Sequence, residues 1–455
     1  MTTDPNPGGR PAPSSPPAQV GRPVPVDLGG APPFRPGPRR ADDRRIAVAS
    51  VLLAAAFLAL AALAAVARPL LGPSVSPWLP LHLALAGGAT VAIAGVMPFF
   101  VAALAAGHPA TVRVRAAAVG LVAVGALLVA ARGVVPSLDW LPALGGVLYL
   151  AGIGATALAV RGSGRAGLMV RRPVVTLGYT LALVNVAIGA TLGTLAVAGW
   201  LPVIERWAAL RPAHAWTNLI GFVSVVIVAT LLHFLPTVLG TRIVPRRSAI
   251  LAVLALAMGS PVVVVGLAFG LGAVAGGGAV LTLIGAGALA LEAVRDLRAR
   301  GRWTTDPGWH LVAEVGLLAG VGWFVVGIAL ASWRIVAFAI GLAPDAWSTP
   351  LVGAPLAVGW VVGVLIASWT HLLPSIGPGG PPEHAAQRRI LGRAAAPRVF
   401  AFNVGVLLLA IGWPLEIAGL AAAGLGLVAV VVIGSAVLAV MALRSPARAT
   451  GRAAT

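Results

Sequence analysis

The chain lacks cysteine altogether and has few charged residues for its length of 455 residues. Without a thiol it cannot form disulfides, iron–sulfur clusters, a thiolate-ligated haem or the CxxCH attachment of a c-type haem. Only 10% of the residues are charged while 59% are hydrophobic, whereas a soluble domain has about 25% charged residues. This composition excludes an ordinary soluble enzyme, and its apolar content excludes a chain that is disordered throughout.

The hydrophobic residues are gathered into long runs between Ile46 and Leu443. A helix that crosses a bilayer needs about 20 apolar residues, and glycine or proline within such a run does not argue against it. Twelve runs are long enough, which predicts an all-α polytopic membrane protein with about twelve transmembrane helices. The expected spans are 46–67, 79–106, 114–135, 140–160, 174–200, 213–240, 249–270, 272–294, 309–332, 350–373, 400–419 and 421–443.

Residues 1–45 differ in composition from everything that follows, because they hold 12 of the 37 prolines together with glycine, serine and arginine. Such a stretch cannot bury a core and predicts a disordered tail. The apolar run after Arg45 is too long for a signal peptide and predicts a retained anchor. The expected organisation is a Pro/Gly/Arg-rich cytoplasmic tail (1–45), a twelve-helix transmembrane domain (46–443) and a short basic cytoplasmic tail (444–455).

All 32 basic residues are arginine, and they give the chain a formal net charge of +19. If the N-terminus is inside, the predicted inner segments hold 27 arginines and the outer loops hold 5. By the positive-inside rule this predicts a multi-pass plasma-membrane protein with both termini cytoplasmic. The basic charge is then an orientation signal, so the expected partner is the lipid bilayer and not nucleic acid.

Histidines are the main candidates for chemistry, because ionisable groups at membrane depth are often functional and imidazole binds copper and haem. His82 and His214 lie at equal depth near the predicted outer ends of the second and sixth spans. We expect them to face one another and share a site, with Asn218 one turn away placed to hydrogen-bond a ligand or to fix the imidazole. His233 and His371, at the inner ends, form a second candidate metal or proton site. The alternative is that each imidazole only hydrogen-bonds water, loops or headgroups.

Small residues follow both outer histidines, with Gly87 and Gly88 after His82 and Gly221 after His214. Because small residues let helices approach closely, we expect a packed seam that a flat cofactor could enter. The remaining polar residues have plainer interpretations. His310 and Glu314 lie four residues apart and are expected to form an i,i+4 pair or a proton relay. Asn185 and Asn403 are expected to bridge helices. His108 and His384 are expected to lie in solvated loops.

The segment 214–240, HAWTNLIGFVSVVIVATLLHFLPTVLG, resembles subunit I of the haem–copper oxidases, especially the divergent NnrS-like members and the actinobacterial membrane proteins called "copper oxidase". The resemblance implies an oxidase-subunit-I-like bundle over residues 46–443. It also implies that His82 matches a haem ligand and His214 a copper ligand near the outer face, with a redox or copper-protein partner.

The chain departs from that family at several ligand positions. The span 249–270 has no histidine, 350–358 has none, and Asn218 stands where the family often places tyrosine. Because the full ligand set is missing, we predict that the chain does not reduce dioxygen, and haem or copper binding near the outer face is the role that the resemblance leaves. The sequence also leaves open a permease for small solutes and a structural or assembly protein without a cofactor, so enzymatic activity stays undecided.

Overall fold

The computed structural model describes residues 38–71, 76, 78–104, 108–134, 138, 140–165, 173–301 and 307–444. This part of the chain forms helices and contains no strand. It has twelve helices that are long and apolar enough to cross a membrane. The all-α polytopic class predicted from the sequence is therefore confirmed. Most of the two predicted tails, 1–37 and 445–455, lies outside the described residues.

Most of the twelve spans are continuous α-helices, and three are composite. The continuous spans are α1 (Pro38–Leu71), α4 (Val112–Ala131), α5 (Trp140–Arg165), α6 (Pro173–Val197), α10 (Arg247–Ala268), α11 (Gly272–Arg298), α12 (Pro307–Ala339), α16 (Ala395–Gly412) and α17 (Ala418–Arg444). In each composite span a π-helical segment joins two α-helical ones. These spans are α2 (Leu79–His82), η2 (Leu83–Ala89) and α3 (Thr90–Leu104); α8 (Trp207–Trp216), η3 (Thr217–Ser224) and α9 (Val225–Val238); and α13 (Thr349–Val352), η4 (Gly353–Val362) and α14 (Gly363–Ile376).

Several predicted boundaries are wrong although the number of spans is right. The eleventh span ends at Gly412 and not at 419, because the chain reverses there through a turn in which Glu416 has a positive φ of 56°. The sixth span begins at Trp207 and the ninth continues to Ala339. Hydropathy alone misses such ends, since interfacial tryptophans and tight turns look apolar in a sequence window.

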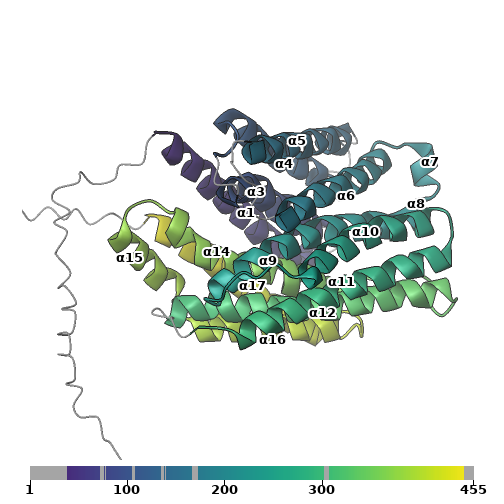
Figure 1. Cartoon of the computed structure of the whole chain (residues 1–455). Coiled ribbons are helices and arrows are strands. Elements are labelled where there is room, and N and C mark those ends of the chain that lie inside the picture. The colour runs from purple at the N-terminus through teal and green to yellow at the C-terminus, as the bar shows by residue number, and fades with distance from the viewer. Residues whose placement is uncertain are drawn as a thin grey trace, which may run out of the picture.

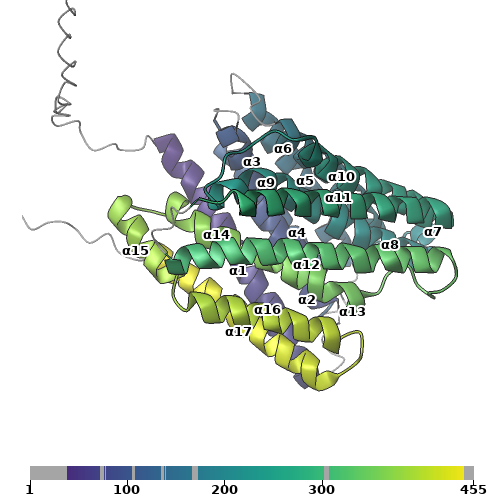
Figure 2. The same ribbon diagram turned by 60° about the horizontal axis from the view of Figure 1, so that its bottom comes forward.

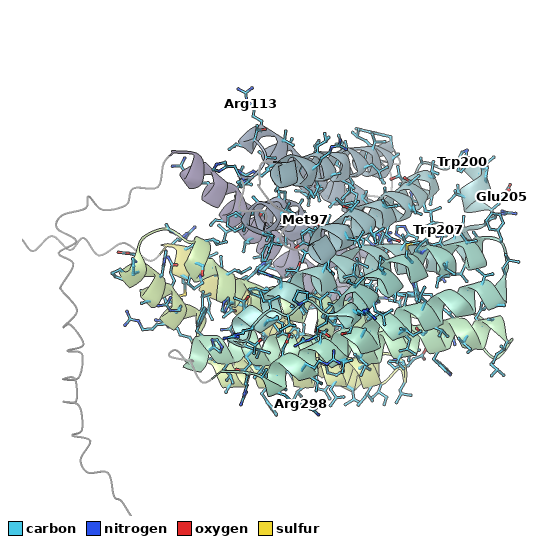
Figure 3. All side chains as sticks on the ribbon, in the orientation of Figure 1. Met97, Arg113, Trp200, Glu205, Trp207 and Arg298 are labelled. Atoms are coloured by element: carbon cyan, nitrogen blue, oxygen red, sulfur yellow. The ribbon has the colours of Figure 1, made fainter. Side chains whose placement is uncertain are left out.

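Two short helices mark the opposite ends of the bundle, α7 (Leu201–Ile204) and α15 (Pro381–Leu391). Figures 1 and 2 both show α7 at one end of the spans and α15 at the other, and we call these the α7 end and the α15 end. Trp200, Glu205 and Trp207 all lie at the α7 end (Figure 3). The charge pattern of the sequence predicts that this end faces outward. The first and last spans, α1 and α17, pack against each other.

The three composite spans form the core of the bundle. Their most apolar windows are 67%, 83% and 78% buried, against 28–56% for the other nine spans. The π-helical segments η2, η3 and η4 all contact one another, and Trp360 of η4 donates a hydrogen bond to Ser224 of η3 at 3.0 Å. The centre of the domain is therefore the place where three π-helical segments meet.

The composite spans also share one sequence pattern, in which a proline stands near each end: Pro80 and Pro98, Pro212 and Pro236, Pro350 and Pro374. Histidine follows the first proline by two positions in the second and sixth spans, while Val352 stands there in the tenth. Histidine precedes the second proline by three positions in the sixth and tenth spans, while Gly95 stands there in the second. The histidines thus occupy equivalent positions at the two ends of the central helices.

Candidate functional site

His82 and His214 lie side by side at the α7 end. Their ring centroids are 6.4 Å apart and the ring planes differ by 11°. His82 is the last residue of α2, and His214 lies in α8, so both occur early in their spans. The ring of Trp78 lies 4.4 Å from His82, and that of Trp207 lies 5.9 Å from His214. The two outer imidazoles are therefore neighbours, as expected, whereas the shared site stays a prediction.

One nitrogen of each imidazole is held by a backbone carbonyl. Nδ1 of His214 lies 2.8 Å from the oxygen of Gly189, and Nδ1 of His82 lies 3.3 Å from the oxygen of Trp78. A carbonyl oxygen only accepts, so each Nδ1 carries the proton and Nε2 keeps its lone pair. Within the described part of the chain, Nε2 of neither ring takes part in a hydrogen bond. Metal-binding histidines commonly have this arrangement.

Asn218 lies next to the His214 imidazole. Its Nδ2 donates to the carbonyl oxygen of His214 at 2.8 Å and lies 3.2 Å from Nδ1 of the same residue. Both nitrogens carry protons and cannot bond each other. Nδ1 of His214 therefore donates to the Gly189 carbonyl, and the Asn218 amide donates to the His214 carbonyl. In this tautomer the Asn218 amide makes no hydrogen bond to the imidazole, so both roles expected for Asn218 stay predictions.

Two glycines of α6 make room for this arrangement, and sequence reasoning missed both. A Cβ on Gly193 would lie 2.7 Å from Cε1 of His214, and a Cβ on Gly189 would lie 2.4 Å from Nδ2 of Asn218. Both distances are too short for real atoms, so larger residues would push the two side chains away. The only sequence signal is that the glycines are four residues apart and therefore share one face of the helix.

The glycines that follow the histidines pack closely against neighbouring helices, whereas the entry of a flat cofactor stays a prediction. A Cβ on Gly87 would lie 2.2 Å from Cδ1 of Phe57, and one on Gly88 would lie 2.9 Å from Cδ2 of Leu58. Side chains of α1 therefore pack directly on these two glycines. The equivalent space beside Gly221 is taken by Ser260 Oγ and Asn185 Oδ1, at 2.4 and 2.7 Å from the position of a Cβ.

The π-helical segments place both histidines. His82 directly precedes η2, and His214 lies three positions before the first residue of η3. A π-helical turn holds an extra residue, and such segments are rare and frequent at functional sites. Each extra residue turns the preceding part of the span by about 100° relative to the part that follows. Periodicity could not reveal these segments, because the helices are apolar on nearly every face.

A second histidine pair lies at the α15 end. The ring of His371 stacks on Trp309 with centroids 4.8 Å apart, and the ring of His310 lies 6.3 Å away. Phe234 meets His371 edge to face at 5.4 Å. Sequence reasoning grouped His371 with His233, whose ligand role stays a prediction, and it missed His310 as a neighbour.

Glu314, expected from its spacing to pair with or relay protons to His310, accepts a hydrogen bond from Arg300 at 2.6 Å. The sequence relates His310 only to this carboxylate and carries no sign of its proximity to His371. The pairing depends on how α12 packs against α14, and the sequence carries no signal for that register.

The other polar residues mostly have structural roles. Asn185 of α6 donates to the carbonyl of Ala257 in α10 at 3.1 Å, and Trp323 of α12 donates to Asn403 of α16 at 2.8 Å. The prediction that both asparagines bridge helices is confirmed. His108 is exposed as expected. His384 is not in a solvated loop, because it lies in α15 with its Nε2 buried.

Among the described residues, no three or more histidine, cysteine, aspartate or glutamate side chains gather into a group that could hold a metal. A scan against protein-family models found no match, and a search of curated proteins found no significant match. The function must be argued from the site itself.

Proposed function

We propose that this integral membrane protein binds one copper ion as Cu(I) between His82 and His214 at the α7 end. The observation that carries the proposal is the pair of nearly parallel imidazoles with ring centroids 6.4 Å apart, each with Nδ1 held by a carbonyl. Such a hydrogen bond fixes the tautomer and presents Nε2 as a ligand.

The separation fits one bridging ion. Two metal–nitrogen bonds of about 2 Å, with about 1.1 Å from each nitrogen to its ring centroid, require centroids roughly 6 Å apart. The observed 6.4 Å agrees with that requirement. A pair of imidazoles in van der Waals contact would lie closer, and two rings facing lipid would point away from each other.

The ligand set favours Cu(I) over other ions. Zinc takes four ligands in its structural sites, whereas Cu(I) accepts two nitrogens in a linear arrangement. No carboxylate lies in the site among the described residues, so a single positive charge costs less in this buried place than a double one. The nearby faces of Trp78 and Trp207 also favour a cation.

The same residues fit a porphyrin poorly. The spans that carry the two rings touch each other through η2 and η3, and the space beside Gly87 and Gly88 is filled by Phe57 and Leu58. A flat macrocycle between the imidazoles would have to force these helices apart. Copper, when bound, supplies a one-electron redox centre or a point for transferring the ion to another protein. The Gly189 carbonyl holds the His214 imidazole for that purpose.

The test is a Cu(I) titration of the purified full-length chain under anaerobic, reducing conditions, with a chromogenic chelator as competitor. We expect His82→Ala and His214→Ala each to lose one equivalent of bound copper relative to the unaltered protein. His108→Ala is the matched control, because that histidine is exposed. Elution volume and melting temperature verify that each variant is folded.

Equal copper content in the folded His82→Ala and His214→Ala variants would overturn the proposal. A Soret absorption band that disappears in the same variants would instead favour haem. Absence of any bound cofactor would favour the permease or structural alternatives.

A further inference from the structure

We infer a second Cu(I) site between His310 and His371 at the α15 end of the bundle. It is separate from the proposed site at the α7 end, because it involves different helices and the opposite end of the domain. The two rings come from α12 and α14, which pack directly against each other. Their centroids are 6.3 Å apart, which matches the 6.4 Å of the other pair.

The spacing again suits one ion between two imidazole nitrogens. His310 is only 3% exposed. Nδ1 of His371 is buried and has no hydrogen-bond partner among the described residues. Buried polar atoms of native proteins are nearly always satisfied, so an unsatisfied one needs an explanation such as an ion or a water molecule. An ion shared with His310 satisfies it.

Aromatic side chains enclose the His371 ring and hold it in place. Trp309 stacks on one face with planes 15° apart, and Phe234 packs edge to face. The indole Nε1 of Trp309 donates a hydrogen bond to the carbonyl oxygen of Thr370, which keeps the indole against the imidazole. Few orientations therefore remain for the His371 ring, and a ligand that is held in this way loses little entropy on binding.

The charges nearby favour a monovalent ion. Arg388 lies over the Trp309 ring, 5.7 Å from its centroid. The nearby carboxylates have other partners, because Glu314 pairs with Arg300 and Glu383 accepts from the backbone nitrogen of Gly380. With these carboxylates engaged elsewhere, a site made of two imidazole nitrogens suits Cu(I) better than Zn²⁺ or Cu²⁺.

The experiment counts Cu(I) bound to the purified full-length chain under the anaerobic conditions described above. The protein should bind two equivalents, and His371→Phe should bind one, since phenylalanine keeps the stacking on Trp309 and removes both nitrogens. His310→Gln is the second variant and should also bind one. The His82→Ala/His214→Ala double variant should bind one, and the combination of that double variant with His371→Phe should bind none.

This set of variants separates the two sites. If His371→Phe loses one equivalent while the His82→Ala/His214→Ala protein binds as much as the unaltered one, the second site stands and the proposed function fails. If folded His371→Phe and His310→Gln both keep full stoichiometry, the inference is overturned. It is also overturned if these variants change only proton uptake in the metal-free protein, because the pair would then share a proton.

Discussion

At the scale of single residues, Gly193 decides whether the His214 ring can occupy its position. A methyl group there would meet Cε1 of His214 at 2.7 Å, and the ring is already held by the Gly189 carbonyl on one side. The imidazole cannot retreat without lengthening that hydrogen bond. The glycine therefore acts on the site through the orientation of the ligand.

We predict that Gly193→Ala weakens Cu(I) binding at the α7 end by about 10- to 100-fold, the usual effect of disturbing the residues that orient a metal ligand. The measurement is the dissociation constant from competition with a chelator. Gly154→Ala is the control, because a Cβ there meets nothing within 4 Å. Unchanged affinity in Gly193→Ala would show that the ring has room to move or does not bind the ion.

Whether a site residue can be identified from the sequence depends on how often its residue type occurs in the chain. The chain has 7 histidines, so equal depth on two helices was enough to bring His82 and His214 together. Gly189 and Gly193 are 2 of 57 glycines, and nothing in the sequence distinguishes them from glycines that only pack helices. The contact between His310 and His371 depends on the packing of two helices that the sequence leaves undetermined.

At the scale of elements, the contacts between η2, η3 and η4 explain why three spans are composite. A straight α-helix keeps one residue in every 3.6 on a given face. A π-helical segment changes that register, so each composite span turns one face toward its neighbours at the α7 end and a different face in the rest of the span. Sequence analysis predicted the existence of these helices from their length. It could not predict their π-helical segments, because apolar residues on all sides leave no periodic signal.

We predict that the hydrogen bond from Trp360 to Ser224 couples η4 to η3. Trp360→Phe should destabilise the protein by about 1 kcal/mol, the usual net value of one hydrogen bond. Because both single changes remove the same bond, Trp360→Phe combined with Ser224→Ala should cost less than the sum of the two. The measurement is thermal unfolding in detergent.

Trp347→Phe provides the control, because its indole donates at 3.1 Å to Thr349 in an exposed position. We expect that change to leave the melting temperature nearly unaltered. Strict additivity of Trp360→Phe and Ser224→Ala would mean that the two π-helical segments are not coupled through this bond.

At the scale of the whole molecule, the distribution of arginines predicts the orientation of the protein in the membrane. Arginines such as Arg246 lie at the α15 end, where Arg246 forms ion pairs with Glu292 at 2.7 Å and Asp296 at 3.5 Å. Hydrogen bonding to Glu292 raises the pKa of the Arg246 guanidinium, so this side chain stays charged at any physiological pH. A charge that is never lost is a reliable topological signal.

The last prediction is that the α15 end faces the cytoplasm and the α7 end faces outward. The predicted inner segments carry 27 of the 32 arginines, and an even number of spans returns the chain to its starting side. Reporter fusions after Arg45, Arg300 and Arg444 should therefore read inside, and a fusion after Gly341 should read outside. Gly341 follows α12 in the turn before α13, so this fusion tests the α7 end directly. An inside signal at Gly341 would reverse the orientation, and opposite signals at Arg45 and Arg444 would contradict the twelve-span count. The outcome also bears on the proposed copper site, because an outward α7 end would place His82 and His214 within reach of a copper or redox protein outside the membrane.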